Sequence, residues 1–215
     1  MSKSIAVFGL GRYGKSLAYT LYDAGADVMV VDKDPKLVES VANEVTIAIT
    51  ADVSNAEAIK GLGVEEMDVV VVAMGSDLTA SIMSVMVCKE LGVSYVMAKA
   101  SDERMGAILT KVGADKVLYP EEESGARTAR TIVSDSFLEF FDIDKNLCII
   151  EMKPKKEWIG KNLIDLNLRK KYHINVVAMR EDTEMRAFID PNKPLEEDTE
   201  LLVIVEKNDL KLLKG

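Results

Sequence analysis

The sequence contains very little histidine and cysteine, and it lacks a long hydrophobic run. His173 is the single histidine among 215 residues, so histidine acid–base catalysis or a multi-histidine metal site has almost nothing to use. The two cysteines, Cys88 and Cys148, stand in a helix-like and a strand-like segment without metal-ligand spacing. We expect both to be buried as small hydrophobic residues. The longest apolar run, 69–74, falls far short of the roughly 18–20 residues that a membrane-spanning helix needs.

Positive charge is also scarce relative to negative charge. The formal net charge is −9, which argues against nucleic acid as a partner, although a local basic patch could still bind one small anion. The opening residues MSKS run directly into a strand-like segment without the apolar stretch of a signal peptide. We therefore expect a cytoplasmic protein, built as one good-sized domain or as one domain plus a small lobe.

Short β-rich runs alternate with helical patterns as far as about residue 140. Several runs are continuously apolar, as in VVVVAM, which is typical of parallel strands buried on both faces. Gly25, Gly92 and Gly113 stand just past the ends of helical patterns, where a left-handed cap favours glycine. The pattern predicts the α/β class with a Rossmann-like doubly wound parallel sheet. The predicted strands are Ser4–Gly9, Asp27–Asp32, Val45–Thr50, Val69–Met74, Tyr95–Ala100 and Lys116–Tyr119. The predicted helices are Tyr13–Ala24, Pro35–Asn43, Asn55–Leu62, Asp77–Leu91 and Glu103–Val112.

A longer helical pattern follows Pro120 and extends from Glu121 to about Phe141. Apolar residues recur at three- and four-residue steps on one face, so this helix either packs on its own sheet or joins a second subunit. The polar, turn-prone stretch 142–146 then suggests a boundary. Beyond it the pattern predicts a small C-terminal α+β lobe with a strand, a helix over 162–172, three more strands and a short terminal helix. The predicted domains are therefore 1–141, with a trailing dimerisation helix, and 147–215.

The glycine pattern Gly9-x-Gly11-x-x-Gly14 follows a predicted strand and opens a predicted helix, and Asp32 ends the next strand. In that context the first two glycines permit a tight turn and close backbone approach, while Gly14 lets the helix pack on the strand. Free N–H groups and the helix dipole then favour a diphosphate. Asp32 would accept hydrogen bonds from ribose hydroxyls and repel a 2′-phosphate. The loop therefore suits NAD(H), ADP or ATP but not NADP(H), unless it serves tight packing alone.

Three charged side chains near this loop have two interpretations each. Arg12 adds a cation that suits the terminal phosphate of ATP, or it is a solvated arginine at a helix start. Asp52 follows the third strand, where it meets an adenine edge or caps the next helix. Glu121 follows Pro120 and offers a hard oxygen ligand for Mg²⁺ or Ca²⁺. It also fits an ordinary helix start, where an acidic residue favours the dipole.

Five segments together resemble the RCK family, the regulators of potassium conductance that serve as cytosolic subunits of Ktr and Trk potassium transport systems. The segments are VFGLGRYGKSL, VVDKD, MAKA, GADKVLYPEEESG and IDLNLRKKYHINVVAM, and the resemblance covers nearly the whole chain. It is closest to Ktr-type subunits with a single RCK unit. The resemblance implies a gating subunit and not an enzyme. Its N-terminal lobe would bind ATP, ADP or NAD(H), and its dimers would form an octameric ring, of one RCK chain or of two. That ring would dock on the inner face of the cell membrane against a separate potassium-transporting chain.

The resemblance also implies roles for individual residues. Arg12 matches an arginine that meets the terminal phosphate of ATP, and Glu121 matches a glutamate that holds Mg²⁺ or another cation at the nucleotide dimer interface. Ala51 departs from the family, whose members often have glycine before the aspartate that Asp52 matches. The implied nucleotide-binding residues are Gly9, Gly11, Arg12, Tyr13, Gly14, Asp32, Lys33, Asp52, Val53, Ala73, Lys99 and Glu121.

The C-terminal lobe of some relatives binds cyclic di-AMP between two copies. The matching segment here contains Leu163, Ile164, Arg169 and Asn175, which would line such a pocket or form an apolar dimer seam with an exposed arginine. His173 is expected at the surface or the seam.

Two other functions fit a dinucleotide loop. An NAD-dependent oxidoreductase needs a substrate pocket and a proton-transfer group beside the nicotinamide. Here no such constellation stands out, and the sole histidine lies in the small second lobe. A free-standing NADH-binding redox sensor would differ from a gating subunit in preferring NADH over ATP and in having no membrane partner.

Overall fold

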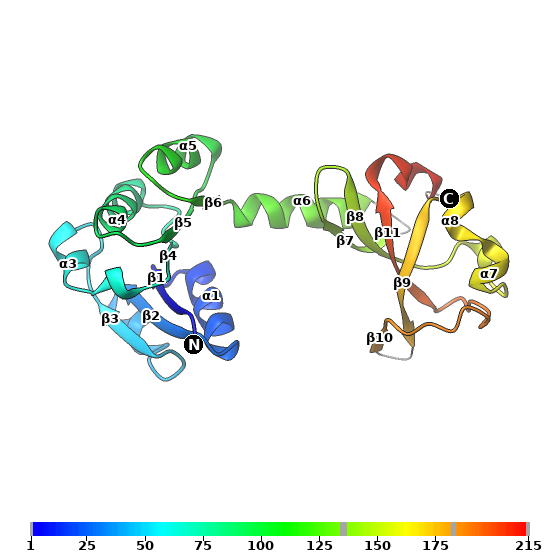
Figure 1. Ribbon diagram of the computed structural model, residues 1–215, viewed down its shortest axis with the longest axis horizontal. Helices are drawn as coiled ribbons and strands as arrows, with labels where there is room; N and C mark the ends of the chain where they lie inside the picture. Colours follow the sequence, from blue (N-terminus) through cyan, green and yellow to red (C-terminus); the bar gives the residue numbers. More distant parts are fainter. Residues whose placement is uncertain (1, 134–136, 182–183, 214–215) are drawn as a thin grey trace. The chain divides into compact units, whose positions relative to one another are not determined.

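The computed structural model describes residues 2–133, 137–181 and 184–213 (Figure 1). The chain forms two compact units, Met1–Glu122 and Glu123–Gly215, and each is described by itself. None of the helices described here has the length and apolar character needed to cross a membrane.

The first unit is built on a six-stranded sheet in which every neighbouring pair is parallel. The strand order is β3-β2-β1-β4-β5-β6, so the direction of winding reverses between β1 and β4. This confirms the Rossmann-like fold, whose ligand crevice lies at that switch point. The strands are β1 Ser4–Phe8, β2 Asp27–Asp32, β3 Ile47–Thr50, β4 Val69–Val72, β5 Tyr95–Lys99 and β6 Lys116–Leu118.

Most helices of this unit begin at a side chain that caps them. Asp34, Asn55, Asp77 and Asp102 each accept a hydrogen bond from a backbone N–H in the first turn of the helix that follows. The helices are α1 Arg12–Asp23, α2 Pro35–Glu39, α3 Ala56–Lys60, α4 Leu78–Glu90 and α5 Glu103–Lys111, with a short 3₁₀ turn at Val64–Glu66. Several of them end on glycines with positive φ, as the sequence predicted.

Alternate residues of each strand feed two separate cores, one on each face of the sheet. Val7 of β1 packs in the core that contains Ala18 of α1. Its neighbour Phe8 packs in the other core, with Val85 of α4 and Leu109 of α5. Burial on both faces explains why these strands read as continuous apolar runs.

The second unit holds an antiparallel sheet of five strands in the order β10-β9-β11-β8-β7. The helix α6 (Pro120–Val133) begins in the first unit and continues into the second. The strands are β7 Phe137–Asp142, β8 Leu147–Met152, β9 Ile174–Glu181, β10 Glu184–Arg186 and β11 Glu200–Glu206. Short helices α7 (Leu163–Leu166) and α8 (Leu168–Lys171) and two 3₁₀ turns, Lys156–Trp158 and Lys207–Leu212, complete it. Its core surrounds Trp158.

The predicted helix to Phe141 is wrong over its last residues. Residues 137–142 form β7, which pairs with β8, and the predicted boundary 142–146 is the turn of that hairpin. The register of this pair shifts between Phe137 and Glu139. A bulge of this kind lets Phe137 and Phe140 both face the core, although three-residue spacing would otherwise put them on opposite faces. The spacing of the buried residues in this bulged strand is therefore the same as on one face of a helix.

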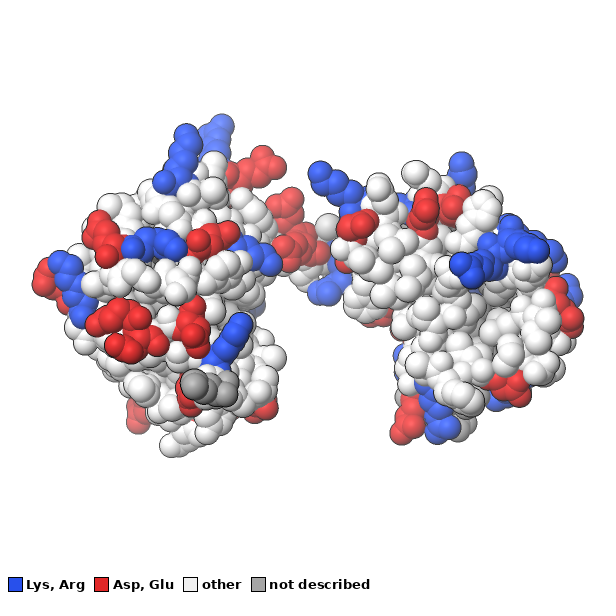
Figure 2. All heavy atoms as spheres, in the orientation of Figure 1, with Lys and Arg blue, Asp and Glu red and all other residues white. Residues whose placement is uncertain are grey.

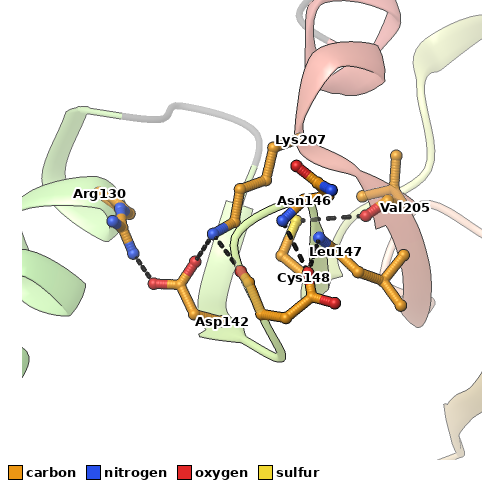
Figure 3. A network of polar contacts seen from close by, with 8 residues as sticks. Arg130, Asp142, Asn146, Leu147, Cys148, Val205 and Lys207 are labelled. Carbon is orange, nitrogen blue, oxygen red and sulfur yellow. Dashed lines mark hydrogen bonds and ion pairs between the residues drawn. The ribbon is translucent and has the colours of Figure 1, made fainter.

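The hairpin end carries a small polar network, shown in Figure 3. The carboxylate of Asp142 lies between Arg130 of α6 and Lys207 after β11 and binds both. Partial burial opposes its ionisation, but the hydrogen bonds from Lys207 and Arg130 outweigh that and hold the pKa of Asp142 below its usual value. These contacts fix the end of α6 to the second sheet.

The predicted helix over 162–172 is interrupted. Asn167 takes a left-handed conformation with φ 47° and separates α7 from α8. Asparagine tolerates that conformation better than most residues do, because its short polar side chain can form hydrogen bonds to nearby backbone. The other differences are small: β3 starts at Ile47, α2 ends at Glu39, and the terminal helix is a 3₁₀ turn.

Candidate functional site

A cavity of about 890 Å³ opens at the carboxyl ends of the strands of the first unit. It lies where β1 and β4 are neighbours, which is the switch point of the sheet. Every residue of the predicted nucleotide set except Gly14 lines it. The lining residues are Gly9, Gly11, Arg12, Tyr13, Asp32, Lys33, Ala51, Asp52, Val53, Ala73, Met74, Gly75, Ser76, Asp77, Leu78, Ala80, Lys99, Ser101 and Glu121.

The three glycines of the loop have different reasons to lack a side chain. A Cβ on Gly14 would lie 1.9 Å from the carbonyl oxygen of Gly9, and a Cβ on Gly9 would lie 2.6 Å from the side chain of Met74. Packing within the protein therefore requires both. At Gly11 a Cβ would meet nothing within 4 Å, and the backbone there, with φ −61°, suits any residue. The open space at Gly11 is on the side where a ligand would approach.

The N-terminus of α1 offers hydrogen-bond donors to that space. Gly11 is the N-cap residue, and no side chain caps the helix. The first N–H groups of an α-helix have no partner within the helix, and together with the helix dipole they favour an anion. A diphosphate or a terminal phosphate fits this end of α1.

Asp32 ties the glycine loop to the end of β2. Its Oδ2 accepts a hydrogen bond from the backbone N–H of Leu10 at 2.6 Å, and its Oδ1 accepts one from Asp34 at 2.9 Å. Each carboxylate oxygen keeps a further lone pair for a hydroxyl donor. Asp32 can therefore hold the loop in shape and still accept from a ribose.

Asp52 is not the N-cap of α3, because Asn55 fills that position. Its Oδ1 accepts hydrogen bonds from the Ser54 hydroxyl at 2.7 Å and the Ser54 N–H at 3.0 Å. These bonds, with a smaller contribution from the charge of Lys33, lower the pKa of Asp52. The cavity therefore has an ionised carboxylate on this wall.

Lys99 and Glu121 form an ion pair on the opposite wall. Lys99 ends β5 and its ammonium lies 2.5 Å from Glu121 Oε1 in the first turn of α6. The Lys99 side chain is only 14% exposed, whereas that of Glu121 is 71% exposed. The hydrogen bond from Lys99 lowers the pKa of Glu121. The same ammonium lies 5.8 Å from the centre of the Tyr13 ring.

This arrangement does not make a metal centre within one chain. The described residues contain no group of three or more His, Cys, Asp or Glu side chains able to hold a metal ion. Glu121 contributes a single carboxylate, and the ammonium of Lys99 already neutralises it. A Mg²⁺ ion held by Glu121 would therefore take its other oxygen ligands from waters, from nucleotide phosphates or from a second chain.

The sequence prediction missed the loop after β4, which contributes Met74 and its successors up to Leu78 to the cavity. It also missed Ser101, which follows β5. The strand order could have identified both, because loops after the carboxyl ends of strands on both sides of a switch point line the crevice. The glycine motif draws attention to one side only.

The second unit contains a smaller hollow of about 310 Å³ beside α7 and α8. All four residues predicted there line it, namely Leu163, Ile164, Arg169 and Asn175. Figure 2 shows lysine and arginine side chains gathered over the region of α7 and α8, and Arg169, Lys170 and Lys171 form the last turn of α8. The lining of the hollow is mixed, because Asn167, Arg169 and Asn175 stand there among apolar side chains.

Comparison with known proteins agrees with this organisation. Residues 5–120 match the TrkA-N domain family and residues 147–214 match the TrkA-C domain family. The Ktr system potassium uptake protein C of Bacillus subtilis is 32% identical over 98% of this chain and 95% of its own length. The Ktr system potassium uptake protein A of Vibrio alginolyticus is 33% identical over 96% and 94%.

A solved structure of the GsuK channel bound to NAD matches 100% of this chain with a TM-score of 0.69 and 17% identity. This chain spans 40% of that channel chain, so the likeness shows a shared fold. The two domain matches stand in order, and both Ktr relatives exceed 30% identity along nearly the whole chain. The protein therefore belongs to the RCK family of TrkA-N/TrkA-C proteins, to which the resemblance of its motifs had assigned it.

Proposed function

We propose that this chain is a nucleotide-binding regulatory subunit of a potassium uptake system, and not an enzyme. The observation that carries the proposal is the cavity at the switch point, where the uncapped N-terminus of α1 meets Arg12, Lys99 and Asp32. Those groups would recognise phosphate and ribose, and the single histidine of the chain, His173, is not among the residues that line the cavity. The names of the Ktr relatives support the link to potassium uptake.

The ligand would be ATP or ADP, or NAD(H) as the alternative of the same class. ATP and ADP differ by one phosphate, so only groups that reach that phosphate distinguish them. Arg12 is exposed at the first position of α1 and lines the cavity, which supports the proposal that its guanidinium would meet the phosphates. Binding would act as a switch to the extent that the two nucleotides prefer different states of the assembly.

Titration calorimetry tests the nucleotide site. Wild type and Arg12→Ala are titrated with ATP, ADP, NADH and NADPH, each with Mg²⁺ and with EDTA. A charge-assisted hydrogen bond contributes roughly 1.5–3 kcal/mol, so Arg12→Ala should weaken ATP by about tenfold or more and ADP by less. Lys15→Ala, on the same helix, is the matched loss of one positive charge. Binding of NADH but not ATP would overturn the ATP switch in favour of the redox-sensor reading.

The regulatory role also requires assembly and a membrane partner. Ile132 and Val133, at the end of α6, are 76% and 81% exposed within one chain, and α6 has no buried residue. An apolar cavity of about 550 Å³ lies beside Ala129 and Val133 of that helix. We propose that α6 joins two copies, that dimers form an octameric ring of one RCK chain or two, and that the ring binds a potassium-transporting chain at the cytoplasmic face of the membrane.

Native mass spectrometry measures the ring. An even-numbered assembly that Val133→Asp reduces to monomers would support this role for α6, with the exposed Ile143→Asp in the hairpin turn as control. Recovery of a potassium-transporting membrane chain on the full-length protein would support the gating role. A stable monomer that binds nucleotide would contradict it.

Two further ligands belong to the proposal. A cation such as Mg²⁺ at Glu121 would take its other ligands from nucleotide phosphates, waters or a second copy, and it would have to displace Lys99. Cyclic di-AMP would occupy the hollow beside α7 and α8, where Arg169 would meet its phosphates and Leu163 and Ile164 would pack on the adenines. Calorimetry with cyclic di-AMP on wild type and Arg169→Ala tests this, with Lys161→Ala as a charge-matched control.

A further inference from the structure

The ion pair between Lys99 and Glu121 joins the nucleotide cavity to the first turn of α6. Lys99 stands at the carboxyl end of β5, and a Cβ on Gly75 would lie 3.0–3.3 Å from its Cγ, Cδ and Cε. The stem of Lys99 therefore runs along the loop after β4 and spans the cavity wall. Its ammonium reaches Glu121, which belongs to the helix through which the chain leaves the first unit.

The cavity has few positively charged side chains, and one of them, Lys99, is already paired with Glu121. Arg12, Lys33 and Lys99 line the cavity together with Asp32 and Asp52. A nucleotide brings two or more negative charges to this space, and Lys99 is the cation whose side chain is largely shielded from solvent. Shielded charges interact more strongly than exposed ones. A phosphate in the cavity therefore competes with Glu121 for the same ammonium.

We propose that Lys99 tethers the first turn of α6 and releases it when a phosphate binds; this inference rests on the proposed nucleotide function. Without ligand its ammonium holds Glu121 in the first turn of α6, and a bound phosphate draws it away and releases that turn. The exposure of Glu121 makes the pair weak enough to break. The tether would couple occupancy of the cavity to the helix that continues into the second unit.

Two roles for Glu121 predict different ATP affinities for Glu121→Gln in the absence of divalent cations. If Glu121 competes for Lys99, Glu121→Gln should bind ATP roughly two- to fivefold more tightly in EDTA, which is the range that an exposed ion pair supports. If Glu121 serves as a cation ligand, Glu121→Gln should weaken ATP in Mg²⁺ and leave binding in EDTA unchanged. Glu122→Gln removes an exposed carboxylate from the same turn and serves as the matched control.

A double-mutant cycle by calorimetry on the full chain tests the competition. Lys99→Met keeps the aliphatic stem and should weaken ATP. In that background Glu121→Gln should change affinity no more than Glu122→Gln does, because the ammonium is gone. Adenosine, which has no phosphate, should bind all four proteins alike. Melting temperatures without ligand check that each variant is folded.

Hydrogen exchange of the segment 120–133 tests the release of α6. ATP should raise exchange in its first turns in wild type, and Glu121→Gln should show raised exchange before ATP is added. Weaker or unchanged ATP binding by Glu121→Gln in EDTA, or exchange that does not respond, would overturn the tether while leaving the nucleotide site intact. Failure of wild type to bind ATP, ADP or NADH would instead overturn the proposed function, and the tether with it.

Discussion

The glycine loop allows a paired test, because Gly11 and Gly14 lack side chains for different reasons. In Gly14→Ala the new Cβ would lie 1.9 Å from the carbonyl oxygen of Gly9 and 3.2 Å from the Cβ of Ala73. Carbon and oxygen atoms in close contact are about 3.3 Å apart, so the helix and the loop must separate by about 1.4 Å. In Gly11→Ala the new Cβ meets no protein atom within 4 Å.

The two substitutions should therefore affect different properties. Overpacking of this kind costs roughly 1–3 kcal/mol or more, offset by about 1 kcal/mol from better helix propensity. Because the clash is with backbone, we expect a net loss of about 2 kcal/mol for Gly14→Ala. That is a fall in melting temperature of roughly 8 °C for a unit of this size. Gly11→Ala replaces one weak N-cap residue by a poorer one and should cost less than about 1 kcal/mol.

For nucleotide affinity we expect Gly11→Ala to have the direct effect, whereas Gly14→Ala acts chiefly on stability. A methyl group at Gly11 stands where a phosphate approaches the N-terminus of α1, so ATP should bind at least about tenfold more weakly although the protein melts almost as wild type does. Scanning calorimetry and titration calorimetry measure the two effects. Trp158, the single tryptophan, lies in the second unit, and its fluorescence serves as a reference that should not move. Wild-type ATP affinity in Gly11→Ala, or a wild-type melting temperature in Gly14→Ala, would refute the reasoning.

Three further predictions concern the cores and the hairpin. Phe140→Ala should destabilise the second unit by about 3–4 kcal/mol, read by Trp158 fluorescence in urea, whereas Phe141→Ala, at a 42% exposed position, should cost under about 1 kcal/mol; equal losses would contradict the strand. The pKa of Asp142 is lower in the folded protein than the value of about 3.9 for an unfolded chain. Its ion pairs therefore stabilise the protein fully above the unfolded pKa, and this stabilisation is lost as the pH falls through the folded pKa. Asp142→Asn should therefore flatten the acid limb of a stability–pH curve. Burial raises the pKa of Cys88 to about 12, so it should resist iodoacetamide at pH 8 until urea unfolds the first unit.

The alternating sheet of the first unit was predictable because its strands are buried on both faces. Continuous apolar runs such as 69–74 leave little ambiguity, and the glycines past the helix ends mark the turns. The strand β7 was not predictable in the same way. Phe137 and Phe140 face one core through a bulge, and the spacing that a bulge produces is the spacing of a helix. Periodicity alone cannot separate the two when a strand is irregular.

The cavity at the switch point was predictable, because the carboxyl ends of neighbouring strands meet at one edge of the sheet. Gly9 follows β1, and Asp32 and Lys99 are the last residues of β2 and β5, so sequence order and fold class suffice to bring them to one edge of the sheet. The partner of Lys99 was a different problem. Glu121 is 22 residues away on a helix, and only the path of the lysine stem along Gly75 shows that the two groups meet.

The ion pair between Lys99 and Glu121 makes the roles of these two residues depend on each other. The resemblance of the sequence implies that Lys99 binds the nucleotide and that Glu121 holds a cation, as two separate roles. In the folded chain each neutralises the other, so neither can take its predicted role without giving up its partner. A phosphate that recruits Lys99 leaves Glu121 exposed and charged, and only then is the carboxylate free for a cation or for a second copy of the chain. The ion pair itself sets the order of these events: the phosphate binds Lys99 first, and Glu121 becomes free afterwards. A site built in this way responds to the charge that the nucleotide carries and not only to its presence.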